Sequence, residues 1–475
     1  MDFNKYYSPE KYDPYSITSI LNYAKDLKHH TLAETCHPDI LEKSYAGKGN
    51  FGHYLEKFYF GFDPNNNPQP DFRYIGVELK SGAIIETKKG FRAKERLAIG
   101  TINYSNIVNE SFETSNVWKK LKMLLLVFHI YKKDEDPRKY KISNINIVQY
   151  TNSEIAQIKD DWNLVKNKVS VGKAHEISGG DTLFLEAATT GGKNQNYVPQ
   201  PFSDDLAHPR RFALKPAFVT TLLKKGEYFD NEIVEVTDNE IVEVTDNEII
   251  EVTDNEIIEV TEDKPLNHIV PPRTFLLKKL QEYKNISLEE TINMLGIEYS
   301  TQKNFISRVS KKLVEQTLLD EYSENTFESL ELIHKTCRVY DGKLREHISF
   351  PHMKYDKLVQ KEWEESDFNQ IIEAKFMFVF WENVKDEFYL RNIVFWNAPP
   401  KEVNEAKRIW ERTKLLIIDK QADNLPKINE SYFVHVRPHG RDSNDKYPTP
   451  YGVDVKKQSF WMHKKYIEEN ILKVQ

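Results

Sequence analysis

The sequence predicts an α/β fold that is built twice along one chain. Buried-strand patterns of the same kind occur at 123–131 (MLLLVFHIY) and at 376–381 (FMFVFW). Each is followed by a second predicted strand and then by an amphipathic helix that contains a tryptophan, Trp162 or Trp410. Because these elements recur in the same order, we interpret the chain as a duplicated fold rather than one large domain.

The remaining elements of the two halves also correspond. Each half opens with two helices whose apolar residues recur three and four positions apart. These helices are predicted at 16–27 and 47–61 in the first half, and at 286–297 and 301–316 in the second. Residues 345–366 then align with 94–115, and the second strands lie at 141–150 and 390–396. Taken alone, the second helix pair could also be a helix-turn-helix that reads a DNA groove; the alternative is a packing pair.

An acidic repeat separates the halves. DNEIVEVT and then DNEIIEVT each occur twice between residues 230 and 261, and repulsion between charges of one sign should keep such a segment extended. We interpret it as a linker that expanded by duplication. The alternative is an acidic strip that imitates phosphate and docks on a basic DNA cleft. The predicted domains are therefore 1–226 and 265–475, joined by a linker at 227–264.

Composition limits the class of protein. The 475 residues are 39% hydrophobic and 29% charged, which suits folded domains rather than a disordered chain. We expect neither a signal peptide nor a transmembrane helix, and the two cysteines suit the cytoplasm. The net charge is −7, but residues 230–263 hold 14 acidic residues and no lysine or arginine. The rest of the chain carries all 66 basic residues and is net positive, which permits DNA binding.

One short stretch carries candidate chemistry. Asp71 precedes Glu78 and Lys80 in the run PDFRYIGVELK, where Glu78 and Lys80 share one face of a predicted strand. Two carboxylates form a hard-oxygen site for Mg²⁺, and a lysine beside them can orient water and stabilise charge on a phosphate. This combination can hydrolyse a phosphodiester. Glu56, on the predicted helix at 47–61, is a third carboxylate within reach of the strand.

The order and spacing of several motifs add to this pattern. They are KGNFG at 48–52, PDF at 70–72, GVELK at 76–80, FETS at 112–115, KKLK at 119–122, GKAHE at 172–176, PFSD at 201–204, RRFALK at 210–215, HVRPH at 435–439 and KKQSFW at 456–461. The set resembles the MutH family of metal-dependent DNA endonucleases. It resembles more closely the two-domain type II restriction endonucleases related to MutH that cleave at GATC. The resemblance covers nearly the whole chain apart from the acidic repeat.

This resemblance implies a mixed sheet flanked by helices in each of two tandem MutH-like PD-(D/E)xK domains, the second catalytically degenerate. It implies that Asp71, Glu78 and Glu56 hold Mg²⁺, with the Leu79 carbonyl as a further ligand, and that Lys80 orients the attacking water. A second active-site lysine is Lys120, or Lys122 if the alignment is off by one turn. Lys48 would contact DNA near the scissile phosphate.

The remaining DNA contacts are expected on basic loops and hairpins. Arginine is the usual reader of guanine, although most basic side chains contact phosphates. The candidates are Lys193, Arg210, Arg211 and Lys215 in the first half and Arg437 and Lys457 in the second. The second half lacks the metal site, because Ser310 aligns with Glu56 and LIHKTCRVYDGK at 332–343 replaces GVELK. We expect a catalytically inactive copy that still binds DNA; the alternative is an inert packing domain.

The implied function is Mg²⁺-dependent cleavage of double-stranded DNA at GATC, 5′ of the G, with the second domain binding a second site as an effector. The expected protein is a monomer that dimerises on DNA, and a cognate methyltransferase would act on the same site. Two alternatives remain. One is a nicking enzyme of mismatch repair, and the other is a GATC-binding regulator that does not cleave.

Overall fold

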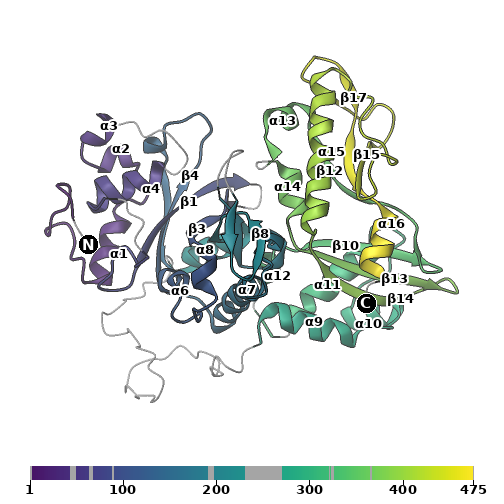
Figure 1. Ribbon diagram of the computed structural model, residues 1–475, viewed down its shortest axis with the longest axis horizontal. Coiled ribbons are helices and arrows are strands. Elements are labelled where there is room, and N and C mark those ends of the chain that lie inside the picture. Colours follow the sequence, from purple (N-terminus) through teal and green to yellow (C-terminus); the bar gives the residue numbers. More distant parts are fainter. Residues whose placement is uncertain are drawn as a thin grey trace. The chain divides into compact units, whose positions relative to one another are not determined.

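The computed structural model describes residues 3–42, 50–63, 68–87, 90–190, 197–229, 270–319, 321–322, 326–363 and 366–473. It forms two compact units, which are considered separately below (Figure 1). The first unit takes residues 1–172 and 184–271, and the second takes 173–183 and 272–475. The acidic repeat lies outside the described residues. Among the described residues, no helix is long and apolar enough to cross a membrane.

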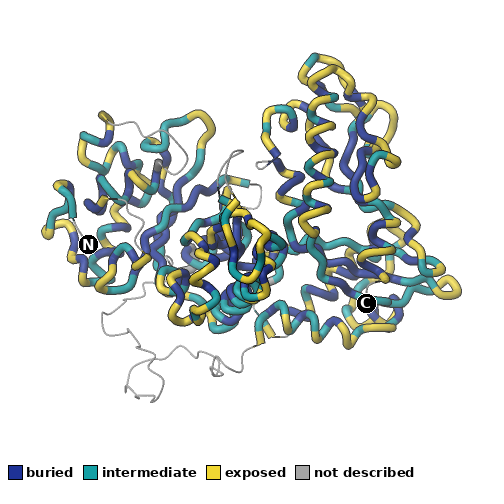
Figure 2. The backbone as a smooth tube through the Cα atoms, viewed as in Figure 1, coloured by how far each residue is buried: buried dark blue, intermediate teal, exposed yellow. Residues whose placement is uncertain are grey.

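The first unit is built on a mixed four-stranded sheet. Its strand order is β2 (Gly90–Ala93), β1 (Glu78–Thr87), β4 (Leu124–Ile130) and β5 (Ile142–Ile147). β1 and β4 run parallel, whereas both outer pairs are antiparallel. β4 is buried along almost its whole length, which explains its continuous apolar sequence (Figure 2). Leu79 of β1 and Leu125 and Val127 of β4 pack in one core with the aromatic side chains of the first helices.

A second, antiparallel sheet and a hairpin complete the strands of the first unit. They are β3 (Leu97–Thr101), β9 (Arg210–Leu214) and β6 (Leu185–Thr189) in the sheet, and β7 (Val198–Gln200) and β8 (Ser203–Ala207) in the hairpin. The main helical elements are α1 (Ile17–Lys25), α2 (Leu32–Thr35), α3 (Asp39–Glu42), α4 (Asn50–Tyr54), the π-helix Leu55–Phe60, α5 (Tyr104–Ile107), α6 (Asn116–Leu121), α7 (Asn152–Ser170) and α8 (Pro216–Phe229).

The second unit repeats this topology strand for strand. Its four-stranded sheet has the order β11 (Lys343–Leu344), β10 (Ile333–Tyr340), β13 (Phe376–Val384) and β14 (Glu387–Trp396), again with one central parallel pair. Its other strands are β12 (Ile348–His352), β18 (Gln458–Met462) and β15 (Val434–Pro438) in a sheet, and β16 (Lys446–Pro448) and β17 (Asp454–Lys456) in a hairpin. The expected α/β fold and its duplication are confirmed.

Helices occupy corresponding places in the second unit. They are α9 (Pro272–Glu282), α10 (Leu288–Leu295), α11 (Phe305–Leu319), α12 (Thr326–Ser329), α13 (Tyr355–Gln360), α14 (Asp367–Ile372), α15 (Pro400–Ile418), α16 (Lys464–Ile467) and the π-helix Glu468–Leu472. α15 matches α7: both have 19 residues and bury a tryptophan, Trp410 and Trp162. α11 buries one face and contacts α9, α10 and β10, so in this structure it packs within its unit.

Local sequence signals explain where the principal helices begin. α7 starts with a capping box, in which the backbone N–H of Thr151 donates to Glu154 at 2.8 Å. α10 starts in the same way at Ser287 and Glu290. α6 and α14 each begin after a serine that accepts a hydrogen bond from the third residue beyond it.

A short segment from the first half of the sequence belongs to the second unit. Within residues 173–183, Ser178 and Asp181 accept hydrogen bonds from the Asn397 side chain, at 3.2 and 3.1 Å. Gly180 is packed so tightly against Asn397 that an added Cβ would lie 2.6 Å from the Asn397 Cβ. The units are therefore not simply the two halves of the sequence, because packing rather than chain order joins this segment to its unit.

Candidate active site

The turn before β1 brings Asp71 to Glu78. The sequence suggested a strand that already included Ile75, but residues 73–76 form a turn and the strand begins at Glu78. Phe72 pairs with Val77 across this turn, and Gly76 has a positive φ of 70° that reverses the chain. As a result the Asp71 N–H donates to Glu78 Oε2 at 3.2 Å, and the Leu79 N–H donates to Asp71 Oδ2 at 3.0 Å.

Two lysines hold the Glu78 carboxylate. Lys80 Nζ donates to Glu78 Oε1 at 2.5 Å and to the Leu79 carbonyl at 3.2 Å. Lys120 Nζ donates to the same Glu78 oxygen at 2.9 Å from the last turn of α6. Glu78 is fully buried, so these charge-assisted bonds compensate a carboxylate that water cannot reach. Lys122, the alternative to Lys120, is exposed.

Glu56 completes the acidic group from the π-helix. Burial, followed by the negative charge of Asp71, raises the pKa of Glu56 to about 7. Burial, followed by the charge of Glu78, also raises the pKa of Asp71. Burial opposes the charged form of Lys80, but attraction to Glu78 and Asp71 outweighs it and raises the lysine pKa. The cluster thus has three carboxyl groups against two lysines, and its negative charges repel one another.

The donor set fits a hard divalent cation. Carboxylate and carbonyl oxygens are the ligands that Mg²⁺ prefers. The pKa values of Glu56 and Asp71 are raised first by burial and then by the charge of a neighbouring carboxyl group, and a bound cation would offset both effects. In the described part of the chain, however, no three His, Cys, Asp or Glu side chains already converge as a metal site. The Asp71 and Glu78 carboxylates instead accept hydrogen bonds from the backbone and from lysines.

The expected DNA contacts of the first unit occupy different environments. Arg211 is exposed on β9. Arg210 and Lys215 are each 5% exposed, and Arg210 donates to the Ala187 carbonyl at 2.6 Å. Arg210 and Arg211 point to opposite faces of β9, because alternate residues of a strand do so, and Lys215 lies just beyond the end of that strand. Lys48 and Lys193 lie outside the described residues.

The corresponding strand of the second unit can be aligned by its hydrogen bonds. The N–H of Glu78 donates to the carbonyl before β4, Met123, at 3.0 Å. The N–H of Ile333 donates to the carbonyl before β13, Lys375, at 2.9 Å. Ile333 therefore stands where the first unit has Glu78, and Lys335 stands where it has Lys80.

Other candidate residues of the second unit have protein partners. The Ser310 hydroxyl accepts a hydrogen bond from Trp381 Nε1 at 2.8 Å. Arg437 is exposed, with its guanidinium 5.5 Å from the ring centroid of Trp461. Lys457 forms an ion pair with Asp445 and lies 4.6 Å from the ring centroid of Tyr447. Lys335 was not among the residues predicted from the sequence. It follows Ile333 by two residues, just as Lys80 follows Glu78 in the run ELK of the first unit, and this spacing could have identified it.

Comparison with known proteins agrees with the fold. The sequence model of the family described as DNA mismatch repair enzyme MutH matches residues 60–161, which include Asp71, Glu78, Lys80 and Lys120. The type II restriction enzyme Sau3AI of Staphylococcus aureus is 26% identical, over 94% of this chain and 98% of its own length.

MutH proteins of mismatch repair align with less of the chain. Those of Shewanella woodyi and Vibrio campbellii are 25% and 27% identical, over 45% of this chain and 94% and 96% of their own lengths. The similarity to the restriction enzyme therefore includes both halves, whereas these repair proteins match less than half of the chain. The chain is a MutH-related nuclease of the type II restriction endonuclease kind, and thus a site-specific deoxyribonuclease.

Proposed function

We propose that the first unit cleaves double-stranded DNA at GATC, 5′ of the G, with Mg²⁺ as cofactor, and that the second unit binds a second GATC site as an effector. The observation that carries this proposal is the meeting of Glu56, Asp71, Glu78, Lys80 and Lys120 at the start of β1. We infer the GATC specificity from the sequence resemblance to the MutH-related restriction endonucleases.

Asp71, Glu78, Glu56 and the Leu79 carbonyl would hold the cation. When bound there, Mg²⁺ would supply Lewis-acid activation of water and neutralise charge at the phosphate. Lys80 keeps 22% of its side chain exposed, so it can orient a water molecule and donate to a phosphate oxygen. Lys120 fixes the Glu78 carboxylate from α6 and so acts as a positioning residue.

DNA contacts outside the metal site would come from surface cations. Arg211 is the described candidate in the first unit whose charge is exposed, and Arg437 is the exposed candidate in the second. Lys48 and Lys193 stay sequence-based candidates. Arg210, Lys215 and Lys457 would need to leave their present environments to contact DNA, because the first two are buried and the third is paired with Asp445.

The cleavage proposal is tested by plasmid digestion with Mg²⁺ and with EDTA, followed by sequencing of the ends. Double-strand breaks at GATC that require the metal are expected. Nicks in one strand would favour the repair-type alternative, and binding without any breakage would favour a regulator. Substrates methylated at adenine or cytosine would define which modification blocks cutting.

The effector role has a separate test. A plasmid with two GATC sites should be cut faster per site than a plasmid with one, by roughly 5–150-fold if the coupling is of ordinary size. A short GATC duplex added in trans should restore the rate on the single-site plasmid. Sedimentation should show a monomer alone and a dimer with duplex DNA. Equal rates on both plasmids would reduce the second unit to a structural role.

A further inference from the structure

Lys335 in the second unit is a partly buried cation without a carboxylate partner among the described residues. It occupies the strand position of Lys80, but the preceding position on that face is Ile333 rather than a glutamate. Its Nζ donates to the Ser349 carbonyl at 2.8 Å and lies 5.2 Å from the Phe350 ring centroid. Burial lowers its pKa, opposed only by a smaller effect of Cys337. Such a group is costly to bury unless an anion compensates it.

Further nitrogen donors surround this lysine. The pKa of His439 is lowered by burial and then by the nearby charges of His352, Lys303 and Lys335, which places the four groups within electrostatic reach. His439 Nδ1 contacts Ser459 Oγ at 2.8 Å, and the His439 and His352 rings are 4.7 Å apart. The His439 ring centroid also lies 4.9 Å from that of Trp461, which pairs with Ser349, the residue whose carbonyl accepts the Lys335 hydrogen bond.

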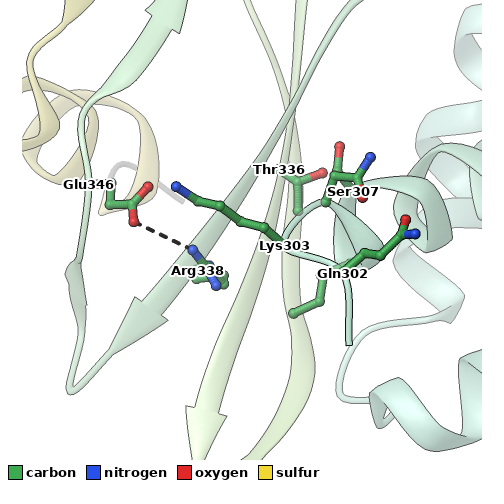
Figure 3. Close-up of a pocket in the computed structure, with 8 residues that line it drawn as sticks. Gln302, Lys303, Ser307, Thr336, Arg338 and Glu346 are labelled. Carbon is green, nitrogen blue, oxygen red and sulfur yellow. Dashed lines mark ion pairs between the residues drawn. The ribbon is translucent and has the colours of Figure 1, made fainter. Parts of the chain in front are cut away.

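Lys303 adds an exposed charge in the turn before α11. It lines an open pocket of about 520 Å³ together with Thr336, Arg338 and Glu346. Figure 3 shows its side chain extending toward the ion pair of Arg338 and Glu346, whose charged atoms are 3.6 Å apart. Because Glu346 already has Arg338 as a partner, Lys303 is the cation of this pocket that can serve an incoming anion.

The two units can therefore attract a phosphate at the same strand position in different ways. In the first unit, carboxylates at the start of β1 are suited to hold a divalent cation against a phosphate. In the second unit, Lys335 stands at the place of Lys80, and Ile333 takes the place of Glu78. A phosphate is attracted in both cases, but only the first arrangement needs a metal.

We propose that Lys335, together with Lys303 and His439, forms a metal-independent site for a backbone phosphate of DNA. This proposal rests on the proposed function, in which the second unit binds a GATC duplex. It adds that this binding needs no divalent cation and uses the former catalytic position as a phosphate contact.

The first test counts duplexes bound by the full-length chain in EDTA, using a fluorescent GATC duplex at several salt concentrations. Two duplexes per chain are expected. Lys335→Met should weaken the second binding event by about 10-fold and reduce its salt slope by about one, as for a single phosphate contact. Lys335→Arg should retain it. The matched control is Lys385→Met, an exposed lysine at the far end of β13.

A second measurement avoids any substitution. The wild-type chain is acetylated in EDTA with and without duplex, and modification of Lys335 is read by mass spectrometry. Saturating duplex should protect Lys335 and leave Lys385 reactive. Protection together with loss of the second event in Lys335→Met supports the site. A second duplex that binds Lys335→Met normally, with Lys335 still reactive, overturns the site but not the effector proposal. If the wild type never binds a second duplex, both proposals fail.

Discussion

The start of β1 and the start of β10 are the same place in two copies of one fold, and both carry a lysine, but only the first has a carboxylate before it. Each strand lies between an antiparallel and a parallel neighbour, and each is joined to the adjacent parallel strand by the same initial hydrogen bond. In one copy Glu78 is buried between two lysines, and in the other Ile333 precedes a lysine without a carboxylate partner in the described chain.

The comparison separates what the fold requires from what the chemistry requires. β4 and β13 stay apolar in both copies, because a strand buried on both faces must be. The first residues of β1 and β10 are free to differ, since the backbone bonds of the sheet do not depend on side-chain charge. A catalytic site can thus be lost, or converted, by a few substitutions that leave the scaffold intact.

The largest expected effect comes from removing the carboxylate that distinguishes the copies. Glu78→Gln should lower the rate of plasmid cleavage by on the order of 1000-fold, because a neutral amide neither holds the cation nor balances two lysines. Binding of a GATC duplex should persist. The matched substitution Ile333→Val removes one methyl group at the corresponding position and should leave cleavage close to wild type. Normal cleavage by Glu78→Gln would rule out the assignment of the active site.

A smaller loss of cleavage rate is expected when Glu78 loses its hydrogen bond from Lys120. Lys120→Met should reduce the cleavage rate by roughly 10–100-fold, because the carboxylate loses one of its two charge-assisted hydrogen bonds. Lys122→Met is the control, since this neighbouring lysine is exposed. Single-turnover rates at saturating DNA would measure the effect on the chemical step. Equal effects of the two substitutions would mean that Lys120 contributes only to the general positive charge.

Introducing a carboxylate into the second copy would test whether its absence there matters for DNA binding. Ile333→Glu should place a negative charge beside Lys335 and weaken the binding of the second duplex by about 10-fold, as expected for the loss of one phosphate contact. Ile333→Gln, which has the same shape without the charge, should have a smaller effect. Combined with Glu78→Gln, Ile333→Glu should not restore cleavage, because one carboxylate does not form a metal site. Tighter binding of the second duplex would contradict this account of Lys335.

The smallest effect is on stability and its dependence on pH. Glu56 has a pKa of about 7 in the folded chain, against an ordinary value of 4.5. The folded state therefore binds this proton more tightly than the unfolded state, so stability falls as pH rises from about 4.5 to about 7. The metal-free wild type should lose more thermal stability than Glu56→Gln between pH 5.5 and 8, by a few degrees in Tm.

Mg²⁺ provides the control for that measurement. At pH 8 the cation should raise the Tm of the wild type and raise that of Glu56→Gln less, because the amide is a weaker ligand than a carboxylate. Identical pH profiles for the two proteins, with identical responses to Mg²⁺, would show that Glu56 does not belong to the charged cluster.

The sequence by itself determined the duplication and the members of the acidic cluster. Apolar runs such as 123–131 and 376–381 specify buried strands, because only continuous apolar side chains satisfy a strand covered on both faces. The motif around Asp71, Glu78 and Lys80 named the residues that meet at the start of β1. Their meeting could be anticipated because the turn and the strand are adjacent in the chain.

Contacts between residues far apart in the sequence, and the burial that they cause, depend on how the elements pack. Contact between Lys120 and Glu78 depends on how α6 packs beside the sheet, 42 residues away along the chain, and the sequence left Lys122 as the alternative if the alignment was off by one turn. The burial of Arg210 depends on which face of β9 meets its neighbours, and that of Lys215 depends on packing just beyond the end of the strand. The isolation of Lys335 depends on the register of β10 against β13. Charge and burial at such positions are set by residues distant in sequence, so composition and local spacing cannot fix them.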